Sequence, residues 1–216
     1  MNVLLFESIA FGISVIGFVY GLITVFMTDS PLYFRTIISA VGCYALEELW
    51  VIVDVLTDAE DAVVSVRLIG IFGCFCAFLT ASRILNKVLF DKGQTKICIP
   101  AVLVSVIFMG LVVLCAVLSA QTNPVLTPVL TCAILLPPIV DSYYECRQLA
   151  AFGKEDARAG AVRPIALLVL LEYAISIAYI LLHTRVLVGL LLDVLSAVVM
   201  ALMVMFCRKG AEKWKT

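Results

Sequence analysis

The sequence has little charge and few long polar stretches. Asp, Glu, Lys and Arg make up 14% of its 216 residues, whereas 63% are hydrophobic and the mean hydropathy is +1.14. A soluble domain carries about a quarter charged residues, because its surface must face water. This chain has too little polar surface to cover its own core, so we expect the lipid bilayer to cover it. We predict a single domain, integral to the plasma (cell) membrane.

Two further shortages exclude classes of function. The only histidine, His183, is predicted at a helix end, and the cysteines are scattered through apolar runs, so no metal-ligand cluster and no metal cofactor are predicted. The net charge of -1, with no basic stripe, argues against a nucleic-acid partner. Residues 1–8 contain Glu7 but no Lys or Arg, so we interpret the first apolar run as a retained helix rather than a secretory signal.

Seven long hydrophobic runs occupy most of the chain. A bilayer core about 30 Å thick is crossed by roughly 20 apolar residues in a helix. The runs are continuously apolar and lack the alternation of a membrane β-barrel, so we predict an all-α, seven-transmembrane-helix bundle. The predicted helices are residues 3–27, 32–56, 62–85, 97–120, 125–149, 164–182 and 186–207.

The distribution of basic residues predicts the orientation of this bundle. Thirteen of the fifteen Lys and Arg residues fall on the connections after the first, third and fifth runs or on the tail. Only Arg67 and Arg185 fall on the other side. Because cytoplasmic loops carry the excess of Lys and Arg, we predict an outside N-terminus and a cytoplasmic C-terminus.

Five charged residues of the predicted membrane spans converge on one layer, from mid-membrane to the outer half. At about 1.5 Å per residue, Glu47 and Glu48 lie about 20 Å from the cytoplasmic end of the second helix. Glu172 lies about 13 Å up the sixth helix, Asp193 about 12 Å down the seventh, and Arg67 about 8 Å down the third. Such residues are costly in lipid and usually face a bundle interior. We therefore predict a polar layer in which at least one acid is protonated, although helix-to-helix pairing alone would also explain Arg67.

Four aromatic residues lie close in sequence to the charged residues of this predicted layer. They would either line a cavity or serve as packing and interface anchors, which is the commoner role. These residues are Tyr44, Trp50, Tyr173 and Tyr179.

The fifth run contains two further features. Pro137-Pro138 is expected to kink or break the helix and to free backbone carbonyls near its middle. Asp141 and Glu145 lie one turn apart near its cytoplasmic end, where we expect them to bond Arg147 or to face water.

Short motifs resemble the seven-helix sensor modules that precede histidine kinases. The resemblance implies a membrane sensor for a small or lipophilic signal. Because no kinase is present in this sequence, a cytoplasmic partner protein would have to carry the output. The motifs are Tyr44-Ala45-Leu46-Glu47, Arg67-Leu68-Ile69-Gly70-Ile71, Ser82-Arg83, and Leu192-Asp193-Val194 in a final helix ending with Arg208.

The chain also resembles the microbial rhodopsins in size, outside N-terminus and short loops. Arg67 matches the arginine of their third helix and Asp193 the aspartate of their last helix. However, Ala197 stands where their retinal-bearing lysine should lie, and no apolar run contains a lysine. A retinal cofactor is therefore excluded.

These observations leave three hypotheses. The first is a receptor or sensor with a polar intramembrane pocket for a small or lipophilic ligand, signalling through a cytoplasmic partner. The alternative is a small-solute or proton-coupled transporter. The third, an intramembrane enzyme using Glu47 and Glu48, lacks a nucleophile arrangement, so catalytic residues are not predicted. The predicted pocket residues are Tyr44, Glu47, Glu48, Arg67, Glu172, Tyr173 and Asp193.

Overall fold

The computed structural model describes residues 3–57, 66–90, 98–120, 126–151, 157–182 and 186–214. Within these ranges every regular element is helical, and all seven long helices are apolar and long enough to cross a membrane. The prediction of a seven-helix, all-α membrane protein is confirmed at that level. The helices are α1 (Val3–Gly21), continued by the π-helix η1 (Leu22–Phe26), α2 (Leu32–Thr57), α3 (Val66–Phe90), α4 (Ile99–Ser119), α5 (Leu126–Ala151), α6 (Ala157–Leu182) and α7 (Val186–Trp214).

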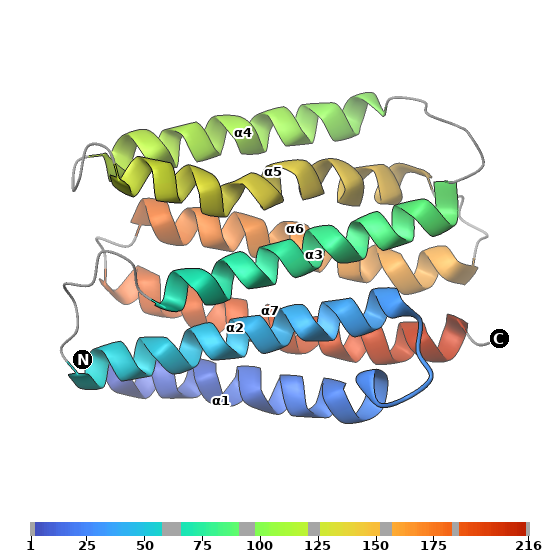
Figure 1. Ribbon diagram of the computed structural model, residues 1–216, viewed down its shortest axis with the longest axis horizontal. Coiled ribbons are helices and arrows are strands. Elements are labelled where there is room, and N and C mark those ends of the chain that lie inside the picture. Colours follow the sequence, from blue (N-terminus) through green and yellow to red (C-terminus); the bar gives the residue numbers. More distant parts are fainter. Residues whose placement is uncertain are drawn as a thin grey trace.

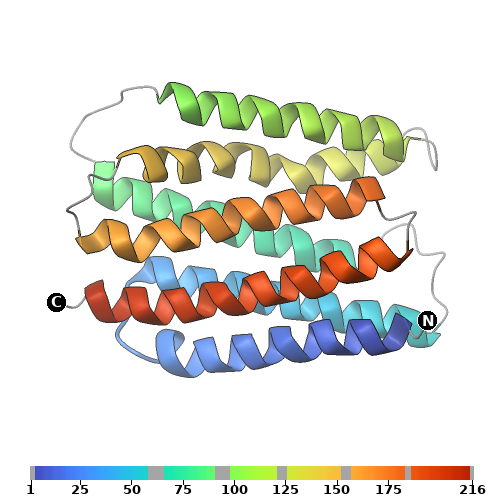
Figure 2. The same ribbon diagram turned by 180° about the vertical axis from the view of Figure 1, so that it is seen from behind.

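The helices lie side by side along the long axis of the molecule (Figure 1). Helix α2 packs on α3, α3 on α5, α5 on α6, α6 on α7 and α7 on α2, which makes a ring of five helices. Helix α1 packs outside the ring on α2 and α7, and α4 packs outside it on α5 and α6. The view from behind shows α6 and α7 in front of α2 and α3 (Figure 2). The two chain termini lie at opposite ends of the bundle, as an odd number of crossings requires (Figure 1).

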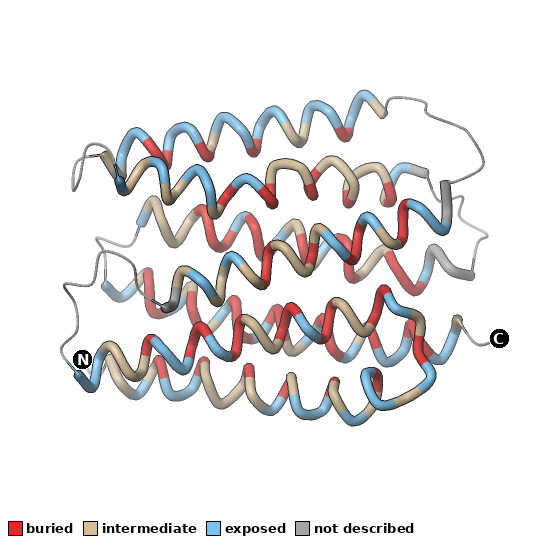
Figure 3. Tube along the Cα trace, in the orientation of Figure 1, coloured by how far each residue is buried: buried red, intermediate tan, exposed pale blue. Residues whose placement is uncertain are grey.

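The buried residues face the middle of this bundle, and the outer helix faces are exposed (Figure 3). Large apolar side chains cover much of that outer surface, and α4 shows the pattern clearly: Ile99 is 71% exposed, Val117 62% and Ile107 61%. Apolar side chains on the outside are stable where hydrocarbon, rather than water, surrounds them. The orientation of the termini and the identity of the membrane stay predictions.

Several helices extend beyond the apolar runs that predicted them. Helix α6 begins at Ala157 rather than at residue 164, so Pro164 lies inside the helix. Helix α7 continues to Trp214 and α3 to Phe90. A hydrophobic run marks the part of a helix that lipid can cover, but backbone hydrogen bonds continue the helix where polar side chains can reach water.

Helix α5 runs without interruption from Leu126 to Ala151, so Pro137-Pro138 does not break it, whereas the kink that was the other expectation stays a prediction. Both prolines are buried, and packing around them holds the backbone in helical conformation. Helix α4 is tied to this region, because the Ser105 hydroxyl donates a hydrogen bond to the Ile139 carbonyl at 2.7 Å. Neighbouring helices can in this way satisfy carbonyls near a proline.

Glycines allow close approach of helices at several points. A Cβ added at Gly17 would lie 3.4 Å from the backbone of Ala201 in α7, and one at Gly21 would lie 2.7 Å from Ile38 in α2. Gly17 and Gly21 are four residues apart, the spacing at which small residues let helices pack closely. The tightest approach to another backbone is at Gly70 of α3, where an added Cβ would lie 3.0 Å from the Cα of Glu47 in α2.

Candidate functional site

A partly open cavity of about 170 Å³ lies among the five helices of the ring. It occupies the half of the bundle where α3, α5 and α7 begin, which is also the end that holds the N-terminus (Figure 1). Its walls are largely apolar, with three acidic side chains and a few hydroxyls. We call it the acidic cavity. The lining residues are Tyr44 and Glu47 from α2, Leu68 and Ile71 from α3, Thr131, Ile134 and Leu135 from α5, Glu172, Ile175, Ser176, Tyr179 and Ile180 from α6, and Leu192, Asp193 and Ser196 from α7.

The acidic cavity contains four of the predicted pocket residues. Tyr44, Glu47, Glu172 and Asp193 all line it, although they come from three different helices. Tyr179, expected either to line a cavity or to pack, is also in the wall.

The other predicted residues lie elsewhere or outside the described part of the chain. Glu48 is 1% exposed but does not line the acidic cavity. Tyr173 is completely buried and points into a separate cluster described below. Trp50 is 37% exposed, as an anchor on the lipid-facing surface would be. The Arg67 side chain lies outside the described residues, so its predicted pairing with an acid stays a prediction.

Hydrogen bonds from neighbouring helices fix two of the cavity groups. The Ser196 hydroxyl of α7 donates to one carboxyl oxygen of Glu172 on α6 at 2.5 Å. The Tyr44 hydroxyl of α2 donates to the backbone carbonyl of Asp193 at 3.3 Å. The second oxygen of Glu172, Oε2, is buried and has no hydrogen-bond partner among the described residues. Such an atom costs free energy unless a donor or a cation reaches it.

Glu172 lies close enough to both other acids to interact with them. It is within electrostatic reach of Glu47 and of Asp193, and all three residues are less than 9% exposed. Carboxylates that share a buried site repel one another, so the site favours neutralisation by protons or by positive charge. The unpartnered Oε2 of Glu172 therefore suits the cavity to a guest that offers a hydrogen-bond donor or a cation.

The position of Glu47 depends on the glycine opposite to it. Gly70 of α3 packs against the backbone of Glu47 with no room for a side chain between them. Two of the cavity-lining residues of α3, Leu68 and Ile71, flank this contact on the same helix. The close approach of α2 and α3 thus sets the distance across this part of the wall.

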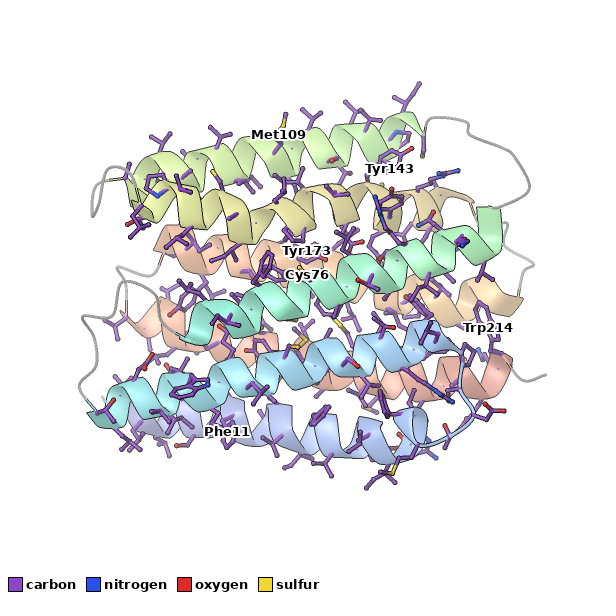
Figure 4. All side chains as sticks on the ribbon, in the orientation of Figure 1. Phe11, Cys76, Met109, Tyr143, Tyr173 and Trp214 are labelled. Atoms are coloured by element: carbon purple, nitrogen blue, oxygen red, sulfur yellow. The ribbon has the colours of Figure 1, made fainter. Side chains whose placement is uncertain are left out.

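Aromatic side chains fill the centre of the bundle beside the cavity. Tyr173 of α6 meets Phe75 and Phe78 of α3 edge to face, with ring centroids 5.3 and 6.1 Å apart, and it meets Phe108 of α4 at 6.2 Å. Figure 4 shows Tyr173 near the middle of the molecule. These rings form a packed layer between the acidic cavity and the opposite half of the bundle.

A second polar group lies beyond that layer and corrects a prediction. Asp141 and Glu145 of α5 neither face water nor bond Arg147, because both are 0% exposed. The Tyr173 hydroxyl donates to Asp141 Oδ2 at 2.6 Å, and the Ser82 hydroxyl of α3 donates to Glu145. The prediction failed because residues near a helix end were assumed to reach the surface, whereas α5 lies against α3 and α6 at this depth.

Amide side chains complete this group. Asn86 of α3 donates to the Ser82 carbonyl at 2.8 Å, and Gln148 of α5 donates to the same carbonyl at 3.4 Å. We call the set of Ser82, Asn86, Asp141, Glu145, Gln148 and Tyr173 the buried polar seam. Sequence reasoning missed it, yet a signal exists: residues 141, 145 and 148 share one face of α5, as residues 82 and 86 share one face of α3.

Comparison with known proteins adds no relative. No protein-family model matches the chain, and neither a curated protein nor a solved structure matches it. The described residues also contain no group of three or more His, Cys, Asp or Glu side chains that could hold a metal ion. The functional argument therefore depends on the geometry of the acidic cavity and of the buried polar seam.

Proposed function

We propose that this protein is a membrane receptor or sensor whose acidic cavity binds a small, partly apolar ligand and which signals through a cytoplasmic partner. The single observation that carries the proposal is a partly open cavity with mostly apolar walls, lined by five helices, three of which contribute one acidic side chain each. A ligand held there touches every helix of the ring, so its binding energy can favour one arrangement of the helices over another.

The volume of the cavity limits the ligand. An apolar cavity of about 150 Å³ in an engineered protein binds benzene. At about 170 Å³, the acidic cavity fits a molecule of similar or slightly larger size. The apolar walls favour a hydrocarbon body, and the acids favour a group that donates hydrogen bonds or carries positive charge.

The packing beyond the cavity supports a receptor rather than the alternative, a transporter. A carrier must open its site to both sides of the membrane in turn. Here Phe75, Phe78 and Tyr173 close the cavity toward the far half of the bundle, and each is at most 1% exposed. Close packing of this kind suits the transmission of helix movements more than the passage of a solute.

Binding is tested with benzylamine, which joins an aromatic body to a cationic amine. We expect it to raise the unfolding temperature of the purified protein in detergent by about 5 °C at saturation. The Glu172→Gln variant should bind it at least about tenfold more weakly, because a hydrogen bond to a charged group contributes about 1.5–3 kcal/mol. Isothermal titration calorimetry measures this loss.

Benzoate and the Glu212→Gln variant serve as matched controls. Benzoate has the same ring but a negative charge, and Glu212 is an exposed acid of α7 outside the cavity. Equal binding of benzoate and benzylamine, or equal losses in both variants, would refute the cavity as an acidic ligand site. Receptor and carrier are separated by two further measurements. A receptor should change hydrogen exchange at residues 203–214 on binding, whereas benzylamine flux into proteoliposomes that Asp193→Asn abolishes would make the protein a carrier.

A further inference from the structure

We infer that the buried polar seam is a proton-binding site, in which Asp141 and Glu145 hold protons in the folded protein. The inference is independent of the proposed ligand site, because the seam and the acidic cavity share no residue. It depends on where the two carboxyls lie, on which charges reach them, and on a count of hydrogen-bond donors and acceptors.

The two buried carboxyls have no paired cation among the described residues. Within the described part of the chain, no Lys, Arg or His forms an ion pair with Asp141 or Glu145. Both side chains are 0% exposed. An isolated carboxylate in an apolar interior is so costly that such a group takes up a proton instead. Two carboxylates one helical turn apart would also repel each other.

The buried polar seam also has more hydrogen-bond acceptors than donors. Each carboxyl has one oxygen bonded, to Tyr173 or to Ser82, and one buried oxygen without a partner among the described residues. The side-chain carbonyl oxygens of Asn86 and Gln148 are likewise buried and have no partner there. With both acids unprotonated, the buried polar seam therefore has four buried acceptors that lack a donor among the described residues. Among the described residues, the Tyr33 hydroxyl of α2 is the buried donor nearby without a partner, and it lies within electrostatic reach of both acids.

Two bound protons, one on each carboxyl, remove this excess of acceptors. A proton on Asp141 Oδ1 and another on Glu145 Oε2 turn two of the four acceptors into donors. The seam then offers three donor groups, counting Tyr33, to the two amide oxygens of Asn86 and Gln148. Every unpartnered oxygen can take part in a hydrogen bond once the side chains adjust, whereas with both carboxylates charged the acceptors stay in excess.

The groups facing the seam are compatible with bound protons. The titratable side chains that reach the two acids directly are Tyr33 from α2 and Tyr173 from α6. Around them, Cys207 from α7 interacts with Tyr33, and Cys74 from α3 interacts with Tyr173. All are neutral donors rather than cations at ordinary pH. They stabilise a neutral carboxyl and supply no positive charge that would hold a carboxylate.

An alkali-metal cation is the competing explanation for a set of buried oxygens. Hard cations of this kind require several oxygen ligands that converge on one point. Asp141 and Glu145 each have one oxygen already bonded to a hydroxyl, so the remaining ligands would be one oxygen of each acid and the two neutral amide oxygens of Asn86 and Gln148. The described residues contain no group of three or more His, Cys, Asp or Glu side chains that could hold a metal ion. A proton requires only one acceptor, so the seam suits protons better.

Infrared spectroscopy of the purified full-length protein tests the inference. Protonated carboxyls absorb apart from carboxylates, and their band shifts in heavy water. We expect the wild-type protein to show this band, and the Asp141→Asn and Glu145→Gln variants each to lose part of it, so that the double variant lacks the intensity of about two carboxyls. Glu172→Gln should remove intensity at a different frequency, because its carboxyl is bonded to Ser196 instead.

The Tyr173→Phe variant keeps both acids and tests the same point if the neutral variants do not fold. Loss of the hydroxyl that donates to Asp141 should shift the frequency of the band without reducing its area. The inference is overturned if the double variant keeps the wild-type band, or if Tyr173→Phe leaves the frequency unchanged. It is also overturned if sodium chloride, compared with choline chloride, raises the unfolding temperature of the wild type alone, since that identifies a bound metal cation.

Discussion

Replacement of Tyr173 by alanine is expected to cost about 3–5 kcal/mol of stability, the largest effect of any single truncation in this bundle. Tyr173 is 0% exposed, and its ring contacts Phe75, Phe78 and Phe108 on two other helices. Its removal leaves a cavity that these rings cannot fill without moving. It also leaves Asp141 without the hydroxyl that donates to it. The measurement is the free energy of unfolding in detergent or bicelles.

The Tyr173→Phe variant separates the two contributions. Phenylalanine keeps the three ring contacts but leaves Asp141 Oδ2 without its donor, which should cost about 1–3 kcal/mol. Leu171→Ala, on the same helix and 45% exposed, is the control for truncation at a lipid-facing position and should cost less than about 1 kcal/mol. If Tyr173→Ala costs no more than Leu171→Ala, Tyr173 is not the packing centre of the bundle.

The central role of Tyr173 also shows what the sequence could predict. Its exclusion from water was foreseeable, since an aromatic residue in the middle of an apolar helix faces either lipid or the core. Its partner was not. Whether a side chain of α6 meets the acidic cavity or the buried polar seam depends on how the helix is rotated, and adjacent residues point about 100° apart. Glu172 and Tyr173 are neighbours in sequence and belong to the two different sites.

The seven helices themselves followed from hydrophobicity, because length and apolar composition suffice to identify a membrane span. Glu47, Glu172 and Asp193 were expected near one layer, and all three line one cavity, although their depth in a membrane stays a prediction. The exposure of Asp141 and Glu145 was misjudged for a tertiary reason. Distance from a helix end indicates exposure only where the neighbouring helices end at the same level, and α3 and α6 cover α5 there.

The order of the helices in the bundle was likewise beyond the sequence. Helix α3 packs on α5, and α4 lies outside the ring. Hydrophobicity does not distinguish a helix that faces lipid on most sides from one in the middle, since lipid and a packed core are both apolar. The distinction depends on how closely the helix surfaces fit together, and small residues are the clearest sign of a close fit in a sequence. Gly70 lies at the closest of these contacts with another helix backbone.

Substitution of Gly70 by alanine is expected to destabilise the protein by about 1–3 kcal/mol, and substitution by valine by more. An added Cβ would lie 2.9 Å from the Cβ of Glu47 and 3.0 Å from its Cα and its backbone nitrogen. Backbone atoms cannot rotate away as the end of a flexible side chain can. Helices α2 and α3 would therefore have to separate, although alanine alone favours a helix by up to about 1 kcal/mol over glycine.

Gly110 provides the matched control for this prediction. It lies in the middle of α4, and an added Cβ there would meet nothing within 4 Å. Gly110→Ala should therefore leave stability unchanged or raise it by up to about 1 kcal/mol through helix propensity alone. Because Glu47 lines the acidic cavity, Gly70→Ala should also weaken benzylamine binding, whereas Gly110→Ala should not. Equal unfolding free energies and equal binding in the two variants would mean that the α2–α3 contact does not set the shape of the cavity.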